Sequence, residues 1–116
     1  LISIYYKYNI FVCLCYKYIK MRTILIIGAG RSASSLIQYL LNKSEKENLH
    51  LVIGDLSLAL AKKKTNNHSN ATAIALDIFD EDQRKKAVQI ADIVISMLPA
   101  HLHIQVAKDC IIYKKH

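Results

Sequence analysis

The sequence predicts an α/β protein with a doubly wound parallel sheet, of which the chain carries the first half. Short apolar runs alternate with segments of helical periodicity, and this βαβαβαβα alternation is typical of parallel sheets. A G-x-G-x-x-A motif lies directly between the first apolar run and the first helical segment. Right-handed crossovers between successive strands then predict a Rossmann-like fold with the strand order 3-2-1-4.

The first half of the alternation begins with an apolar, β-branched run at residues 23–27, which predicts the first strand. Leucine, isoleucine and tyrosine recur at helical spacing over residues 32–42 and predict the first helix. After a charged connector, the apolar run at residues 50–55 predicts the second strand. Residues 56–64 then predict a short helix with a basic end.

The second half repeats the pattern. Small apolar residues predict a third strand at residues 71–76, and an acidic cap opens a helix over residues 80–91. The apolar run at residues 92–97 predicts a fourth strand, which a proline ends. Residues 101–112 predict the last helix.

Composition is that of a globular protein. At 116 residues the chain has room for one small domain, and its 53% hydrophobic and 22% charged residues suit a packed core. The net charge of +7 is spread over short lysine clusters without the aromatic residues or reader motifs of nucleic-acid-binding proteins. We therefore interpret the lysines as solvated helix faces and expect no nucleic-acid partner.

Residues 1–20 differ in character from the rest and contain five of the seven tyrosines. Their apolar run at residues 10–15 is shorter than the roughly 20 residues that span a bilayer, and no secretory signal is recognisable. We interpret residues 1–20 as a non-native or disordered segment upstream of a translation start at Met21, with a membrane-surface segment as the alternative. The domain is expected over residues 21–116, in the cytoplasm and away from membranes.

The three cysteines, Cys13, Cys15 and Cys110, lack the spacing of a disulfide framework or a zinc site. This favours reduced thiols, with Cys110 packed as a small hydrophobic residue. His101 and His103 do not share a helix face, and no metal site is expected there. No catalytic residue is assigned, because no Ser, His, Asp or Cys grouping has the arrangement of a catalytic triad or dyad.

The glycine motif comprises Gly28, Ala29, Gly30, Arg31, Ser32 and Ala33. Its first glycine permits a tight turn, its second lets a pyrophosphate approach the backbone, and its alanine allows the helix to pack closely on the sheet. The helix N-terminus adds unpaired N–H groups and partial positive charge. The motif therefore predicts a binding site for the pyrophosphate of a dinucleotide.

Asp55 ends the second strand, where a carboxylate accepts hydrogen bonds from the ribose hydroxyls of NAD and repels the 2′-phosphate of NADP. We expect NAD as the cofactor, with NADP as the alternative. Lys62–Lys64 would favour NADP, but they follow Asp55 by nearly two helical turns. The other role considered for Asp55 is that of a helix N-cap.

Two further strand ends face the same crevice, because ligands of open α/β sheets bind beyond the carboxyl ends of the strands. Asp77 and Ile78 are expected beside the adenine. The segment after the fourth strand is expected beneath the nicotinamide ribose, and it comprises Ser96, Met97, Leu98 and Pro99. Ordinary loop roles are the alternative for both segments.

Four segments resemble the N-terminal cofactor-binding domain of the saccharopine dehydrogenase (saccharopine reductase) family. They are ILIIGAGRSASSLIQYL, the strand that ends in Asp55, LDIFDED and ADIVISMLPAHLHIQVAKDCI. The resemblance implies that Gly28, Gly30 and Ala33 hold the pyrophosphate, that Asp55 holds the adenosine ribose, and that the segment Ser96–Pro99 lies against the cofactor. Ala100 departs from the family, since many relatives have an aromatic residue after the proline, and this leaves the substrate open.

The resemblance further implies an NAD(P)-dependent oxidoreductase of lysine metabolism that acts on a CH–NH bond. Family members have several hundred residues, so the chain resembles a truncated piece, inactive alone, whose amino-acid-derived substrate is bound by a missing downstream domain. A homodimer is the assembly considered for the full-length form. The alternative function is a non-catalytic NAD-sensing regulatory module of the potassium-transporter type. Such modules usually carry Gly-Asp after the third strand and lack S-x-L-P, so Leu76-Asp77 and the segment Ser96–Pro99 favour the enzyme family.

Overall fold

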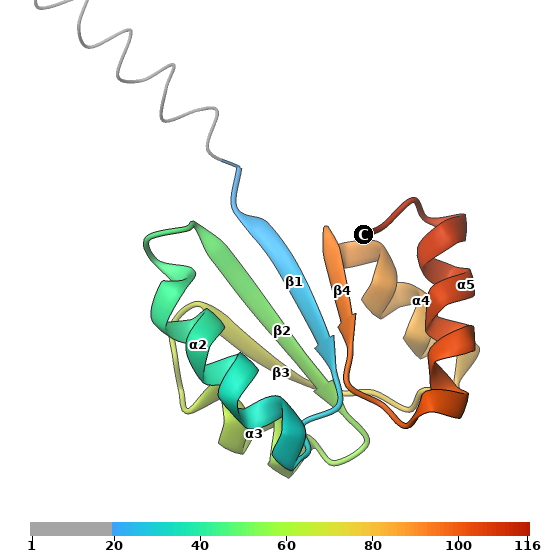
Figure 1. The fold of residues 1–116 in the computed structure, drawn as a ribbon, viewed down its shortest axis with the longest axis horizontal. Coiled ribbons are helices and arrows are strands. Elements are labelled where there is room, and N and C mark those ends of the chain that lie inside the picture. The colour runs from blue at the N-terminus through green and yellow to red at the C-terminus, as the bar shows by residue number, and fades with distance from the viewer. Residues whose placement is uncertain (1–19) are drawn as a thin grey trace, which may run out of the picture.

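A computed structural model describes residues 20–116. The hypothesis that residues 1–20 are a non-native or disordered upstream segment concerns residues outside this range, except for Lys20. The described elements run in the predicted alternation of strands and helices (Figure 1). They are β1 (Arg22–Ile27), the 3-10 helix η1 (Arg31–Ala33), α2 (Ser34–Ser44), β2 (Leu49–Asp55), α3 (Leu58–Thr65), β3 (Ala71–Ala75), α4 (Glu81–Ile90), β4 (Ile93–Ser96), the 3-10 helix η2 (Ala100–Leu102) and α5 (His103–Ile112).

The sheet is parallel, and its order β3-β2-β1-β4 confirms the predicted 3-2-1-4 arrangement. β1 is central, with Ile26 in register with Ile53 of β2 on one side and with Ile95 of β4 on the other. All four strands therefore end at the same edge of the sheet, the lower edge in Figure 1. The loops that follow the strands meet at this carboxyl edge.

Both faces of the sheet are covered, which explains why β1 and β2 read as continuous apolar runs. Ile24 and Ile26 pack with α2 and α3 on one face, and Leu25 and Ile27 pack with α4 and α5 on the other. Figure 1 shows α2 and α3 grouped on one side of the molecule and α4 and α5 on the other. Side chains of β1 thus alternate between two hydrophobic cores, one on each face of the sheet, and β1 contributes to both.

Two helix starts differ from the prediction, and each has a local cause. The helix expected at residue 56 begins at Leu58, because Ser57 is the N-cap and its Oγ accepts the N–H of Leu60 at 3.4 Å. The helix expected at residue 32 begins with the 3-10 turn η1, and α2 follows from Ser34. Short 3-10 turns of this kind are frequent at the N-termini of α-helices.

The predicted acidic cap of α4 is Asp80. Its Oδ1 accepts the N–H of Gln83 at 3.0 Å, and this hydrogen bond lowers the pKa of the Asp80 carboxyl. In a reciprocal capping box the Gln83 side chain would bond the backbone N–H of Asp80. Here its Nε2 donates to Asp80 Oδ2, and its Oε1 accepts the N–H of Asp77. The cap therefore also holds the loop that follows β3.

A buried ion pair joins α4 to α5. Arg84 Nε donates to Asp109 Oδ2 at 2.5 Å, and these residues are only 8% and 3% exposed. Arg84 Nη1 also donates to the carbonyl of Ile78 at 2.7 Å, just after β3. Because removing one partner leaves an uncompensated buried charge, the pair constrains the two helices and this loop together.

Three further observations concern expectations from the sequence. Cys110 is a free, half-buried thiol that packs on the core formed with α4 and α5, and burial raises its pKa. No helix among residues 20–116 has the length and apolarity to cross a membrane. Within the same range, no group of three or more His, Cys, Asp or Glu side chains is placed to hold a metal ion.

The Arg84–Asp109 pair yields a test of stability. Asp109→Ala is expected to lower the free energy of unfolding by about 3–5 kcal/mol, because it leaves the Arg84 guanidinium buried without its counter-charge. The double variant Arg84→Met/Asp109→Leu removes both charges and should recover at least half of that loss. Urea unfolding followed by circular dichroism measures both values. A loss below about 1 kcal/mol for Asp109→Ala would contradict this role of the pair.

Candidate functional site

A cleft of about 190 Å³ lies at the carboxyl edge of the sheet, between the strand ends. Five residues predicted for the cofactor site line it: Gly28, Asp55, Asp77, Ile78 and Leu98. They come from the ends of all four strands and are brought together by the parallel order. This is the position at which open α/β sheets bind their ligands.

Gly28 makes the turn after β1, and the turn requires glycine for two reasons. Its φ of 104° lies in a region that side chains disfavour. A Cβ atom there would also come within 3.1 Å of the carbonyl oxygen of Met97. Gly30 has an ordinary φ of −66°, and a Cβ built on it meets nothing within 4 Å. The space above Gly30 is therefore open to a ligand, whereas Gly28 is closed by the protein's own backbone.

The other residues of the glycine motif are either buried in the core or exposed to solvent. Ala29 and Ala33 are 1% and 0% exposed and pack in the core beneath α2. Arg31 and Ser32 are exposed on η1. Because the first N–H groups of a helix lack intrahelical acceptors, this exposed start of η1 and α2 presents donors suited to an anion.

The carboxylate of Asp55 is the link between β2 and the glycine turn. Its Oδ2 accepts the N–H of Ala29 at 2.7 Å, and its Oδ1 accepts the N–H of Ser57 at 2.8 Å. The helix cap is Ser57, so Asp55 does not itself fill the N-cap role considered for it. Charge-assisted bonds to backbone N–H groups are stronger than neutral ones, and Asp55 therefore fixes the conformation of the turn.

The loop after β3 presents Ile78 and Phe79 at the cleft. Asp77 Oδ1 accepts the N–H of Phe79 at 2.9 Å, which closes a tight turn. Ile78 is 7% exposed and packs into the core, whereas the Phe79 ring is 68% exposed. Ile78 and Phe79 therefore give the cleft an apolar lining at this loop, and the carboxylate of Asp77 is engaged in shaping the loop itself.

The segment after β4 runs directly beside the glycine turn. Met97 donates its N–H to the carbonyl of Ile27 at 2.8 Å, which continues the pairing of β4 with β1. Ser96 Oγ forms a 2.8 Å hydrogen bond with Nδ1 of His103 on α5. Leu98 lines the cleft, and Pro99 is exposed at the start of η2.

Sequence reasoning did not assign several of the residues around the cleft. Leu56, Phe79 and Leu102 line it, and Leu56 is 75% exposed. The signal for Leu56 and Phe79 was an apolar side chain within an otherwise polar loop at a strand end. His103 was considered only as a metal ligand, although its spacing of seven residues from Ser96 suits a contact between the end of a strand and the start of the next helix.

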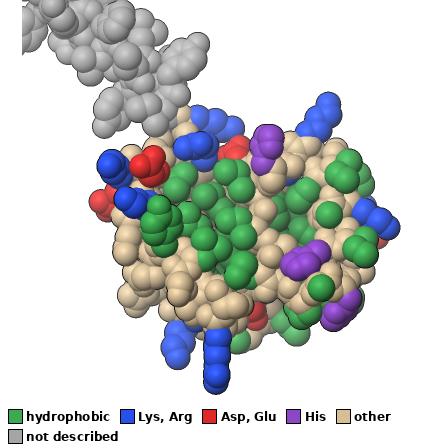
Figure 2. Space-filling model, viewed as in Figure 1, with side chains coloured by type: hydrophobic (Ala, Val, Ile, Leu, Met, Phe, Trp, Pro, Cys, Tyr) green, Lys and Arg blue, Asp and Glu red, His purple; other side chains and the backbone are tan. Residues whose placement is uncertain are grey.

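Lys and Arg side chains are dispersed on the face of the molecule that Figure 2 shows. Figure 2 shows hydrophobic side chains in the middle of the visible face and Lys and Arg side chains around its rim. Lys64 Nζ is hydrogen-bonded to Ser34 Oγ, and Lys85 pairs with Glu81 within α4.

The two glycines predict opposite effects of the same substitution. Gly28→Ala is expected to lower the free energy of unfolding by about 1–3 kcal/mol, through its positive φ and the contact with Met97. Gly30→Ala should leave stability unchanged or raise it by up to about 1 kcal/mol, because its backbone conformation suits alanine and its surroundings are open. Thermal unfolding of both variants measures these changes in stability. Equal losses of stability in Gly28→Ala and Gly30→Ala would contradict the different surroundings described for the two glycines.

The family described as saccharopine dehydrogenase NADP binding domain matches residues 24–116 of the chain. Alpha-aminoadipic semialdehyde synthase of Arabidopsis thaliana is 32% identical over 114 residues, which cover 84% of this chain and 11% of the relative. Saccharopine dehydrogenase (NADP(+), L-glutamate-forming) of Schizosaccharomyces pombe is 36% identical over 96 residues, which cover 83% of this chain and 21% of the relative. The chain thus spans only 11% and 21% of the length of these two relatives.

The fold agrees with these matches. Apo saccharopine dehydrogenase (L-Glu forming) from Saccharomyces cerevisiae superposes with a TM-score of 0.73 at 26% identity, covering 81% of this chain and 20% of that one. The family match, these relatives and this structure all agree with the resemblance to the saccharopine dehydrogenase family. The chain belongs to the family of the saccharopine dehydrogenase NADP-binding domain.

Proposed function

We propose that the carboxyl-edge cleft binds NAD(H), and that the chain is the cofactor-binding part of an oxidoreductase acting on a CH–NH bond in lysine metabolism. The observation that carries the proposal is the turn at Gly28–Gly30, which Asp55 holds by a 2.7 Å hydrogen bond and whose second glycine faces open space. A backbone that is fixed and unobstructed before ligand arrives loses little entropy on binding.

In this proposal the pyrophosphate lies over Gly30 at the exposed start of η1, near Arg31 and Ser32. The buried N–H of Ala29 is already bonded to Asp55, so the free N–H groups further along the motif bind the phosphate. The adenosine half extends toward Asp77 and Ile78, and the nicotinamide half extends toward the segment Ser96–Pro99. Ala33, fully buried, supports the site by letting α2 approach the sheet.

Asp55 favours NAD over NADP. Each carboxylate oxygen has two acceptor positions, so the two bonds to backbone N–H groups leave room for the ribose hydroxyls. A 2′-phosphate at the same place would meet the negative charge of the carboxylate. The family and the S. pombe relative are both named for NADP, so this preference concerns the present chain alone.

The proposal for the activity of the whole protein is based on its relatives. The S. pombe relative is named as an L-glutamate-forming dehydrogenase, and we propose the same class of reaction, with hydride passing between the nicotinamide and a carbon next to nitrogen. The cofactor supplies the hydride chemistry, and residues 20–116 bind and orient it. We assign the amino-acid-derived substrate to a part of the protein outside residues 20–116. The proposal also includes a domain over residues 21–116, a cytoplasmic location and a homodimer of the full-length form.

Titration of the 116-residue chain with NADH and NADPH tests the cofactor site. NADH is expected to bind more tightly, and Asp55→Ala should weaken its binding at least tenfold through loss of ribose and turn contacts together. Asp55→Asn keeps the shape but removes the charge, so it should raise the NADPH-to-NADH affinity ratio. Gly30→Ala should remain folded and bind NADH weakly, because its Cβ occupies the phosphate position.

Glu47→Gln is the matched control, since it removes an exposed acid from the opposite edge of the sheet, between α2 and β2. Its affinities should equal those of the unmodified chain. Tighter binding of NADPH than of NADH by the unmodified chain would contradict the role of Asp55. Binding of neither cofactor to the folded chain would contradict the proposed function.

A further inference from the structure

The turns that follow β2 and β3 are closed in the same way. Asp55 ends β2, and its Oδ1 accepts the N–H of Ser57, two residues later, at 2.8 Å. Asp77 follows β3, and its Oδ1 accepts the N–H of Phe79, also two residues later, at 2.9 Å. Aspartate side chains commonly stabilise tight turns by such bonds. Because β2 and β3 are neighbours in the sheet, the two turns lie side by side at the carboxyl edge.

Each of these turns presents one large apolar side chain to solvent at the cleft. Leu56 and Phe79 both line the cleft, and they are 75% and 68% exposed. Exposed apolar groups gathered at a cleft are typical of a surface that a ligand covers. Arg84 Nη1 donates to the carbonyl of Ile78 at 2.7 Å and so fixes the second turn from below. The backbone that carries both apolar side chains is therefore held in place without a ligand.

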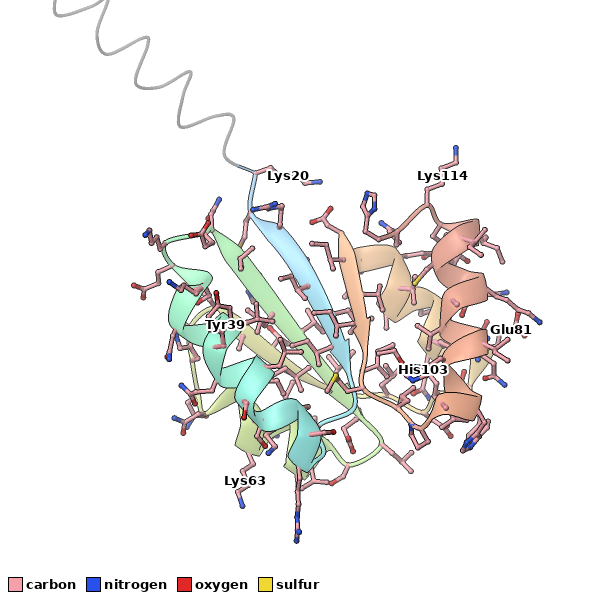
Figure 3. The ribbon with its side chains drawn as sticks, in the orientation of Figure 1. Lys20, Tyr39, Lys63, Glu81, His103 and Lys114 are labelled. Atoms are coloured by element: carbon pink, nitrogen blue, oxygen red, sulfur yellow. The ribbon has the colours of Figure 1, made fainter. Side chains whose placement is uncertain are left out.

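The charges at the cleft indicate which part of a dinucleotide fits there. Among residues 20–116, the side chains that line the cleft include the carboxylates of Asp55 and Asp77 and no lysine or arginine. Figure 3 shows Lys63 of α3 pointing away from the body of the molecule. Two carboxylates would repel a phosphate group but not a neutral ring that carries an amino group. The cleft therefore suits a base better than a phosphate.

From these observations we propose that Leu56 and Phe79 form the contact surface for the adenine ring of the cofactor. The proposal rests on the proposed function, which places the adenosine ribose at Asp55. The base attached to that ribose then lies beside Leu56 and toward β3, away from β4. The Phe79 ring stacks on the base, and Leu56 packs against it, so that both side chains lose their contact with water.

Titration of the 116-residue chain with NADH and with ADP tests the proposal, because both ligands contain adenine. Phe79→Ala is expected to weaken the binding of both by the same factor, about five- to thirtyfold. Phe79→Tyr keeps the ring and should bind both ligands within about twofold of the unmodified chain. Leu56→Ala should weaken the binding of both about three- to tenfold through loss of apolar contact.

Ile90→Ala is the matched control. Ile90 is 59% exposed and ends α4, directly before the start of β4, so it lies at the opposite edge of the sheet from the cleft. Its substitution also removes an exposed apolar side chain, and both affinities should stay unchanged. Thermal unfolding of Phe79→Ala should match that of Ile90→Ala, because neither side chain is packed in the core.

A spectroscopic readout tests the contact with the base itself. The chain contains no tryptophan, so Phe79→Trp places a single indole at the proposed position. Stacking of adenine on this indole should quench its emission when ADP is added. Ile90→Trp places the indole at the opposite edge, and its emission should not respond to ADP.

The outcomes distinguish the two proposals. If the unmodified chain binds NADH and Phe79→Ala binds it equally well, the inference is overturned while the proposed function stands. Loss of NADH affinity without loss of ADP affinity would assign Phe79 to the nicotinamide half, which also overturns the inference. Binding of ADP to Phe79→Trp without a change in emission would contradict the stacking. If the unmodified, folded chain binds neither ligand, the proposed function itself fails.

Discussion

The turn at Gly28 is the point at which three strand ends meet. The N–H of Gly28 donates to the carbonyl of Gly54 at 2.8 Å, and the carboxylate of Asp55 accepts the N–H of Ala29. The Met97 carbonyl oxygen lies 3.1 Å from the position that a Cβ atom on Gly28 would occupy. These contacts are possible only without a side chain at this position. The rest of the site depends on that constraint, because it sets the distance between β2, β1 and β4 at the edge where a ligand binds.

Around this turn the protein has fixed its loops before any ligand is present. Asp55, Asp77 and Ser96 were all expected to meet the cofactor, and each already has a partner within the protein. Their polar atoms hold backbone or neighbouring side chains, while Leu56, Phe79 and Leu98 form the apolar surface of the cleft. This division is typical of preorganised sites, in which polar groups set geometry and apolar groups supply contact area.

The arrangement of strands and the glycine motif could be predicted because each rests on local sequence. Continuous apolar runs, right-handed crossovers and the spacing of Gly28, Gly30 and Ala33 together predict β3-β2-β1-β4 with the site at its carboxyl edge. The Arg84–Asp109 pair and the Ser96–His103 bond could not be predicted in the same way. Each joins side chains on separate elements, and their meeting depends on how α5 packs against α4 and β4.

The same distinction applies to Asp55. Its position at a strand end is visible in the sequence, but its bonds to Ala29 and Ser57 depend on the shape of two adjacent turns. Sequence reasoning therefore predicted a ribose ligand and did not predict the fixed turn.

The central claim is that a dinucleotide lies over the glycine turn at the carboxyl edge of the sheet. Mapping amide chemical-shift changes by NMR as NADH is added tests this location most directly. The account predicts the largest changes at Gly30, Arg31 and Ser32, followed by Ser57, Ile78 and Met97. Changes confined to the opposite edge of the sheet or to the outer surfaces of α4 and α5, with the glycine turn unaffected, would contradict it.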